Sequence, residues 1–140
     1  MEEGTLLYFD PFVFKNGAPP KPKYFIALAN TEDGLILASL PTTKDHVPAD
    51  VEVIRGAVNI PERRVNAYIF EAGDQVTNTY CFPRRTFVYG EQVDEYTDED
   101  LSKMGTAVLN LGVLKPEILA DLKACLKQAA GIKRKYAKLL

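Results

Sequence analysis

Tyr24-Phe25-Ile26-Ala27-Leu28-Ala29 and Leu35-Ile36-Leu37-Ala38-Ser39-Leu40 are two apolar runs of strand length, separated by the turn residues of 30–34. Runs that are apolar on both faces are typical of interior strands. In a tight antiparallel pair, the start of the first strand lies beside the end of the second. The sequence therefore predicts a central hairpin over 21–44 that makes Lys23 and Thr42 near neighbours.

The sequence also predicts short strands on both sides of this hairpin. They are expected over 5–10, 51–54, 67–70, 79–82 and 86–89, with a turn-rich loop over 15–22. Many short strands separated by turn signals are typical of a small barrel or sandwich. Pro11 is expected to limit the first strand, because proline lacks the N–H that a sheet ladder needs.

The pattern becomes helical after Tyr96. Thr97, followed by acidic residues in the first turn, predicts a helix over about 97–104. Pro116 in a first turn and an apolar stripe at helical spacing predict a second helix over about 115–138, with a stop signal at Gly131 and a basic, helical or frayed end. The chain, residues 1–140, is expected to be one mainly β domain with C-terminal helices.

Composition narrows the class of protein. A chain of 140 residues can bury a core without disulfides or a structural metal, and no apolar run has the length of a membrane span. Two isolated cysteines and one histidine, His46, favour neither a disulfide framework nor a zinc site. The short acidic N-terminus does not resemble a signal peptide. We therefore expect a cytoplasmic protein without a cofactor, a metal or a membrane contact.

Charge is unevenly distributed. Residues 127–140 contain five of the 17 basic side chains and none of the 19 acidic ones. A basic tail on an acidic body is one signature of nucleic-acid binding. The alternative is a solvated helix end, since cations are favoured at a helix C-terminus.

No P-loop, GxGxxG or HExxH motif is present, and a lone loop histidine such as His46 is more typical of a surface residue than of a general base. The acidic run over 91–100 is most simply a solvated face. A group of cations and hydroxyls remains, and it comprises Lys21, Lys23, Thr42, Thr43, Lys44, Arg63, Arg64, Arg84 and Arg85.

This group, interspersed with Tyr8, Tyr24 and Tyr80, suits single-stranded RNA: cations and hydroxyls contact phosphates, and aromatic rings stack on bases. RNA can be cleaved without a metal by its own 2′-hydroxyl, if the protein stabilises the charge on phosphorus. The predicted RNA-binding residues are Lys21, Tyr24, Thr43, Lys44, Arg84 and Arg85. The alternative is that these side chains only solvate the ends of strands.

The order of the motifs resembles the MazF/PemK family of plasmid-maintenance toxins, also called cell growth inhibitors. The residues that carry the resemblance are Phe9-Asp10-Pro11, the Gly/Pro loop, Lys21-Pro22-Lys23-Tyr24, Asn30, Pro41-Thr42-Thr43-Lys44 and Asn110-Leu111-Gly112-Val113-Leu114. The motifs are short and follow the family order along most of the chain, with a loose match over 51–96.

The resemblance implies an SH3-like barrel with appended helices that forms a homodimer. It also implies a metal-independent endoribonuclease that acts on single-stranded RNA and is restrained by an antitoxin protein. Thr42 falls at the position of the family's catalytic threonine or serine, and Lys23 at that of its catalytic arginine, so both are predicted to be catalytic. Lysine keeps the charge of arginine but lacks its planar fork.

Two other functions stay open. The departures from the family pattern at Lys23 and Tyr24 favour a catalytically inactive barrel that acts as a protein- or nucleic-acid-binding module. A homodimeric housekeeping protein with a purely structural tail is the third interpretation.

Overall fold

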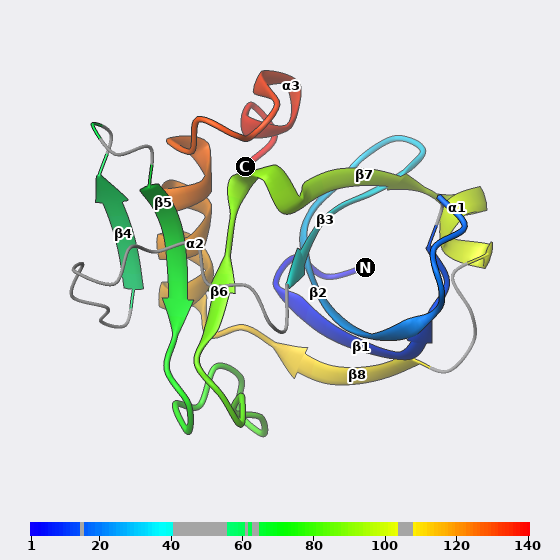
Figure 1. Ribbon diagram of the computed structural model, residues 1–140, viewed down its shortest axis with the longest axis horizontal. Helices are drawn as coiled ribbons and strands as arrows, with labels where there is room; N and C mark the ends of the chain where they lie inside the picture. The colour runs from blue at the N-terminus through cyan, green and yellow to red at the C-terminus, as the bar shows by residue number, and fades with distance from the viewer. Residues whose placement is uncertain (15, 41–55, 61, 63–64, 104–107) are drawn as a thin grey trace.

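The computed structural model describes residues 1–14, 16–40, 56–60, 62, 65–103 and 108–140. The described chain is mainly β, with two antiparallel sheets and helices at one side and at one end (Figure 1). The five-stranded sheet has the order β7-β3-β2-β1-β8 and comprises β1 Thr5–Phe12, β2 Lys21–Asn30, β3 Gly34–Leu40, β7 Val93–Thr97 and β8 Val108–Val113. The three-stranded sheet comprises β4 Gly56–Ile60, β5 Val65–Phe70 and β6 Thr86–Val88, in that order.

The predicted central hairpin is the middle of the larger sheet. β2 and β3 pair with each other in a register that sets Tyr24 opposite Leu40, and they are flanked by β1 and β7. Alternate side chains enter two different apolar clusters: Ile26 and Leu28 belong to one, Phe25 and Ala27 to the other. The prediction that these strands are interior is therefore confirmed, because both of their faces are buried.

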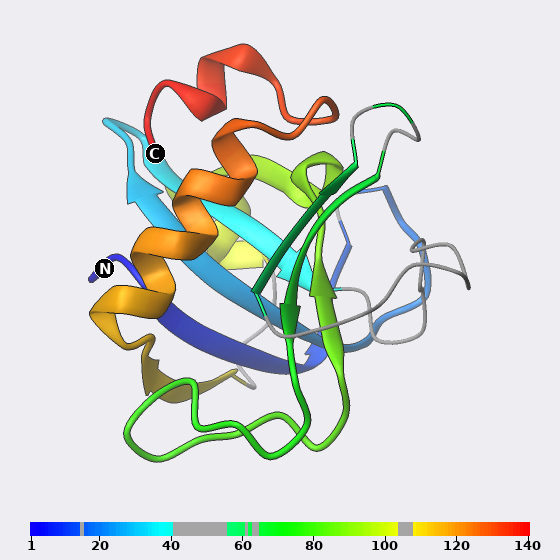
Figure 2. The ribbon, with the colours of Figure 1, turned by 90° about the vertical axis from the view of Figure 1, so that its left-hand side faces the viewer.

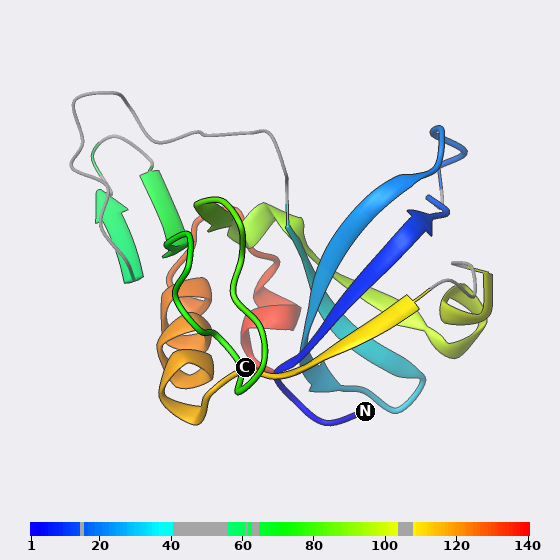
Figure 3. The same ribbon diagram turned by 90° about the horizontal axis from the view of Figure 1, so that it is seen from below.

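The larger of these clusters is the main core. It lies between the five-stranded sheet, the inner face of β5 and helix α2, Pro116–Lys127, which contributes Leu122 and Leu126. Figure 2 shows α2 running across the face of β1 and β2. In Figure 3 the three-stranded sheet and α2 lie on one side of the molecule, and the five-stranded sheet ends on the other side at α1, Asp98–Lys103. No closed barrel is present among the described strands.

Helix α1 begins where the sequence predicts. The N–H of Asp100 donates to Thr97 Oγ1 (3.1 Å), and the N–H of Thr97 donates to Asp100 Oδ2 (3.0 Å). Each side chain thus caps the backbone of the other, which satisfies N–H groups that a helix start leaves unpaired. No helix among the described residues is both long and apolar enough to cross a membrane.

The helix expected over 115–138 is divided in two. α2 ends at Lys127, and α3, Arg134–Ala137, follows a turn after the buried Ala129. This turn packs on η2, the 3-10 turn Gly90–Gln92: an added Cβ at Gly90 would lie 2.5 Å from Cβ of Ala129. The break thus lies near the stop signal that the sequence shows at Gly131, and α2 ends a few residues before it.

The other expected strands differ in places from those observed. The strand expected over 79–82 is wrong, because Thr77 Oγ1 accepts from the N–H groups of Thr79 (3.2 Å) and Tyr80 (3.0 Å) and holds a turn. A single bridge between Gln75 and Cys81 is what remains of that strand pairing. β1 continues through Pro11 to Phe12 beyond its expected end, and its register shifts there, where a ladder N–H is not needed. The expected strand over 51–54 lies outside the described residues.

Candidate nucleic-acid interface

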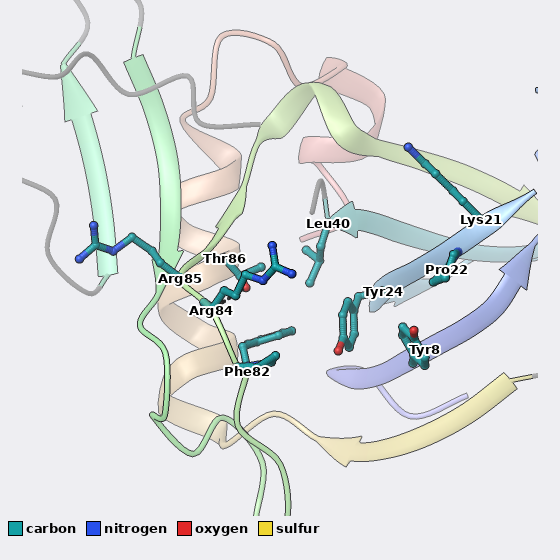
Figure 4. Close-up of a pocket in the computed structure, with 10 residues that line it drawn as sticks. Tyr8, Lys21, Pro22, Tyr24, Leu40, Phe82, Arg84, Arg85 and Thr86 are labelled. Carbon is teal, nitrogen blue, oxygen red and sulfur yellow. Dashed lines mark hydrogen bonds between the residues drawn. The ribbon is translucent and has the colours of Figure 1, made fainter. Parts of the chain in front are cut away.

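A cavity of about 330 Å³ opens where the central hairpin faces the segment before β6 (Figure 4). β1, β2 and β3 supply one wall, and residues 82–86 supply the other. The residues that line it are Tyr8, Lys21, Pro22, Tyr24, Leu40, Phe82, Pro83, Arg84, Arg85 and Thr86. Four of the predicted RNA-binding residues, Lys21, Tyr24, Arg84 and Arg85, are thus brought together from distant parts of the chain.

Three aromatic rings form the apolar side of this cavity. Tyr8 and Tyr24 face each other across the β1–β2 ladder, with ring centroids 4.7 Å apart. The ring of Phe82 is almost fully buried and packs edge-on against that of Tyr24, with the two ring centroids 5.3 Å apart. Because Phe82 is fixed in the main core, the position of the Tyr24 ring is fixed as well.

A hydrogen bond between two hydroxyl groups fixes the other end of Tyr24. Its partner is Tyr80, which belongs to the turn that Thr77 holds. Thr77 Oγ1 also donates to the carbonyl of Leu111 (3.1 Å), which anchors the turn to β8. Burial, and then the hydrogen bond with Tyr24, raises the pKa of Tyr80 well above its ordinary value. The hydroxyl of Tyr80 therefore stays uncharged at neutral pH and adds no negative charge near the cavity.

The two neighbouring arginines have different surroundings. Figure 4 shows the side chain of Arg84 extending toward Leu40 across the cavity, whereas that of Arg85 extends away from it. Arg85 forms a two-point ion pair with Glu71, at 2.7 Å from Nε and 3.2 Å from Nη2. Within the described part of the chain, no ion pair is found for Arg84. Arg84 is consequently the better placed of the two for binding an anion in the cavity.

Lys21 is the second cation at the rim. It is among the residues that line the cavity, but its Nζ lies 5.8 Å from the centre of the Phe14 ring, the same ring that Lys23 approaches. Lys21 and Lys23 share one face of β2, so Arg84 is the cation that extends across the cavity and Lys21 lies at its rim.

Lys23 lies on the opposite face of β2 from Tyr24. Its Nζ is 5.4 Å from the centre of the Phe14 ring, and Phe14 packs against the second apolar cluster, not against the cavity. The alternation of side chains along a strand explains this, since Lys23 and Tyr24 are consecutive. Lys23 does not line the cavity.

Thr42, the predicted neighbour of Lys23, lies outside the described residues, as do Thr43, Lys44, Arg63, Arg64 and His46. The pairing of Tyr24 with Leu40 does bring the start of β2 beside the end of β3, as the hairpin prediction requires. The proximity of Lys23 to Thr42, and the catalytic role of both, stay predictions.

Leu40 and Phe82 are cavity residues that sequence reasoning missed. Leu40 was interpreted only as the end of an apolar strand, and Phe82 as part of a strand that the structure replaces with a turn. The usable signal was the position of Phe82 two residues before Arg84, which combines an aromatic ring with a cation on one short segment.

The described residues contain neither a cluster of metal ligands nor a disulfide. Among the described residues, no three His, Cys, Asp or Glu side chains gather as metal ligands would. Both cysteines are free thiols. Cys81 is exposed, while Cys125 on α2 is buried, and burial raises the pKa of Cys125 to about 11. Comparisons of the chain with protein-family models, with curated proteins and with solved structures found no match.

Proposed function

We propose that the cavity between the central hairpin and residues 82–86 binds single-stranded RNA. The observation that carries the proposal is the combination of an aromatic wall, Tyr8, Tyr24 and Phe82, with Arg84 extending across the cavity and Lys21 at its rim. Its volume of about 330 Å³ is near the lower end of the range for small-ligand pockets, so it suits one nucleotide.

Each part of the cavity has a role in this proposal. An unpaired base stacks against the aromatic wall of Tyr8 and Tyr24, which stabilises binding by about 1–3 kcal/mol per base. Arg84 and Lys21 contact the flanking phosphates, and the planar fork of Arg84 donates two hydrogen bonds to one phosphate. A duplex is disfavoured because its bases already stack on one another and are not available to the tyrosine rings.

A binding experiment tests this proposal. We expect the protein to bind an unstructured oligouridylate more tightly than a duplex RNA of the same length, measured by fluorescence anisotropy. Tyr24→Leu keeps an apolar side chain but removes the ring, and we expect it to weaken binding about tenfold. Tyr96→Leu is the matched control, because Tyr96 packs against the second apolar cluster and does not line the cavity. Equal binding of duplex and single strand, or equal effects of the two substitutions, would contradict the proposal.

We further propose that the bound strand is cleaved without a metal, as the resemblance to the MazF/PemK toxins implies. The 2′-oxygen forms a bond to phosphorus while the bond from phosphorus to the 5′-oxygen breaks. The 2′-hydroxyl loses its proton to water, and the leaving oxygen gains one from water. Lys23 would stabilise the charge on phosphorus, and Thr42 would orient the 2′-hydroxyl or hydrogen-bond a phosphate oxygen. The products are a cyclic phosphate and a 5′-hydroxyl.

Cleavage that continues in EDTA and is lost in Thr42→Ala would support this step. Tyr96→Leu serves again as the control that leaves the proposed binding and catalytic residues intact. Intact RNA at a large excess of protein would show that the catalytic step is wrong, while the binding proposal would stand.

The position of Lys23 favours a second candidate, a binding module without catalysis. Its amine lies near the ring of Phe14, on the face of β2 that points away from the cavity. A cation on that face is poorly placed to reach a phosphate bound beside Tyr24. RNA binding without cleavage, or the isolation of a stable protein partner, would distinguish this candidate from a ribonuclease.

The finer family assignment is part of the same proposal. We propose a toxin-like protein with an open variant of the SH3-like barrel, acting in the cytoplasm as a homodimer and restrained by an antitoxin. The strong curvature of the five-stranded sheet in Figure 1 and the terminal helices support it. Growth arrest on induced expression in a bacterium, absent in Thr42→Ala, is the expected result; normal growth with the unaltered chain would contradict it.

A further inference from the structure

A second hollow, with a volume of about 560 Å³, lies between the end of α2 and α3. Three cations line it: Lys127 from the last turn of α2, and Arg134 and Lys138 from α3 and its C-cap. No carboxylate is among its lining residues, all of which belong to the described chain. The hollow is separate from the cavity beside Tyr24, with which it shares no residue.

The fold holds these cations in place. Tyr136, between Arg134 and Lys138, is 5% exposed and donates a hydrogen bond from its hydroxyl to Asp94 Oδ1 on β7 (3.0 Å). The turn before α3 packs closely on η2, where an added Cβ at Gly131 would lie 3.2 Å from Cβ of Glu91. The backbone that carries Arg134 and Lys138 is therefore anchored at two points and is not a free tail.

Lys127, Arg134 and Lys138 are exposed and line one hollow, so an anion there would meet positive charge from both helices. The helix macrodipole accounts for Lys127 at the end of α2, but not for Arg134, which begins α3. The two remaining basic residues of the tail have another partner: Lys133 and Lys135 lie 5.8 and 5.1 Å from the centre of the Tyr136 ring. The basic residues of the tail thus form two groups: Lys133 and Lys135 lie near the Tyr136 ring, and Lys127, Arg134 and Lys138 line the hollow.

We infer that the hollow between α2 and α3 is a second binding site, for the phosphate groups of a nucleic-acid backbone. Arginine and lysine together are the side chains that hold phosphates, as a planar fork and as a point charge. No aromatic ring lines the hollow, and its apolar wall consists of alanines and Ile132. It offers no stacking surface for a base and no large apolar anchor for a protein, so recognition is by phosphate and independent of sequence.

Two variants of equal charge test this inference. Lys127→Gln/Lys138→Gln removes two cations from the hollow, and Lys133→Gln/Lys135→Gln removes two from the same tail outside it. The first probe is inorganic tripolyphosphate, a chain of phosphates without bases, followed by amide chemical shifts. We expect the unaltered protein to shift at 127–138 and Lys127→Gln/Lys138→Gln to lose about tenfold in affinity. Lys133→Gln/Lys135→Gln should change it less than twofold.

The second probe is oligouridylate at 50–200 mM salt. Three phosphate contacts on a single strand contribute roughly −2 to the slope of log affinity against log salt. Lys127→Gln/Lys138→Gln should reduce the magnitude of that slope by more than one, and Lys133→Gln/Lys135→Gln by less. Thermal unfolding of both variants shows whether a loss of binding reflects a loss of folding. Equal effects of the two variants would overturn the inference, because net charge alone would then explain binding.

A polyglutamate competitor separates nucleic acid from an acidic protein partner. Displacement of tripolyphosphate by polyglutamate at equal or lower charge concentration would overturn the assignment to phosphate. Tyr24→Leu separates this site from the proposed RNA cavity, since it should leave tripolyphosphate binding unchanged. If tripolyphosphate does not bind but Tyr24→Leu still weakens oligouridylate binding, the second site is wrong and the proposed function stands. If tripolyphosphate binds at 127–138 but Tyr24→Leu has no effect on oligouridylate, the second site stands and the proposed function is wrong.

Discussion

The hydroxyl groups of Tyr24 and Tyr80 share a hydrogen bond, although 56 positions separate the two residues in the chain. This bond joins the central hairpin to the turn that Thr77 holds, across the base of the candidate RNA cavity. It links the packing of the fold to the geometry of the site, because Tyr24, which lines the cavity, is held by Tyr80, which does not line it.

Removing either hydroxyl should therefore destabilise the protein, although every ring of the aromatic wall is kept. We expect Tyr24→Phe and Tyr80→Phe each to lower the free energy of unfolding by about 1 kcal/mol, measured in urea. The double variant should lose little more than either single variant, because both remove the same bond. Additive losses in this double-mutant cycle would mean that the two hydroxyls act independently.

Arg84 and Arg85 should have opposite phenotypes despite being neighbours. Arg84→Gln removes the cation that extends across the cavity, so we expect weaker oligouridylate binding and a salt slope about 0.7 smaller, with unchanged unfolding. Arg85→Gln breaks the exposed pair with Glu71, which should lower stability by less than about 1 kcal/mol and leave binding nearly unchanged. Anisotropy titrations and urea unfolding of both variants measure the difference. Equal losses of binding would contradict the orientation of the two side chains.

The two cysteines should react at very different rates. Cys81 is exposed, whereas burial raises the pKa of Cys125 from 9.0 to about 11. At pH 8 we expect iodoacetamide to alkylate Cys81 in the native protein and Cys125 only after unfolding, followed by mass spectrometry of the peptides. Comparable rates at both thiols in the native protein would contradict the packing of α2.

The same pKa shift predicts how stability depends on pH. The folded state keeps the proton of Cys125 while the unfolded state loses it above about 9, so the unfolded state binds fewer protons there. The contribution of this thiol is thus complete below pH 9 and is lost as the pH rises toward 11. Cys125→Ala should make the decline in melting temperature between pH 9 and 11 shallower than in the unaltered protein. An unchanged decline would show that other groups dominate it.

Gly34 should be among the least replaceable residues. It pairs with Thr97 across β3 and β7, and an added Cβ would lie 2.0 Å from the carbonyl oxygen of Tyr96. We expect Gly34→Ala to destabilise the protein by about 3 kcal/mol or more, because backbone on the opposite strand must move. Gly17→Ala is the matched control. The φ of Gly17 is +76°, but a Cβ added there would have no atom within 4 Å, so this variant should lose about 1–2 kcal/mol of stability. Circular dichroism melts of the two variants give the comparison.

The sequence was sufficient for elements that local chemistry defines. The hairpin of β2 and β3 follows from apolar runs and a turn, and the start of α1 follows from Thr97 and the acidic residues after it. β7 and β8 could not be predicted in the same way. Among the described strands both lie at an edge of the sheet with one neighbour each, and their polar and exposed residues follow no clear alternation.

The candidate site was predictable in composition but not in geometry. The cations and tyrosines around it are visible in the sequence, and four of the predicted residues do line one cavity. Which of two adjacent residues faces that cavity depends on strand alternation and tertiary contacts. Lys23 and Tyr24 point to opposite faces because they are consecutive in a strand, but only tertiary packing decides which of these faces lines the cavity and how Arg84 and Arg85 diverge.

The burial of both faces of the central hairpin has a consequence for how the chain finds its pairing. In most sheets a slip of one residue is penalised because it exposes apolar side chains to water. In β2 such a slip would only exchange the contents of two cores, placing Phe25 where Ile26 belongs. The correct pairing must then be selected by side-chain volume and by close backbone contacts such as that of Gly34 with Tyr96. Substitutions in β2 that change only the size of an apolar side chain should therefore misalign the strands before they unfold the protein.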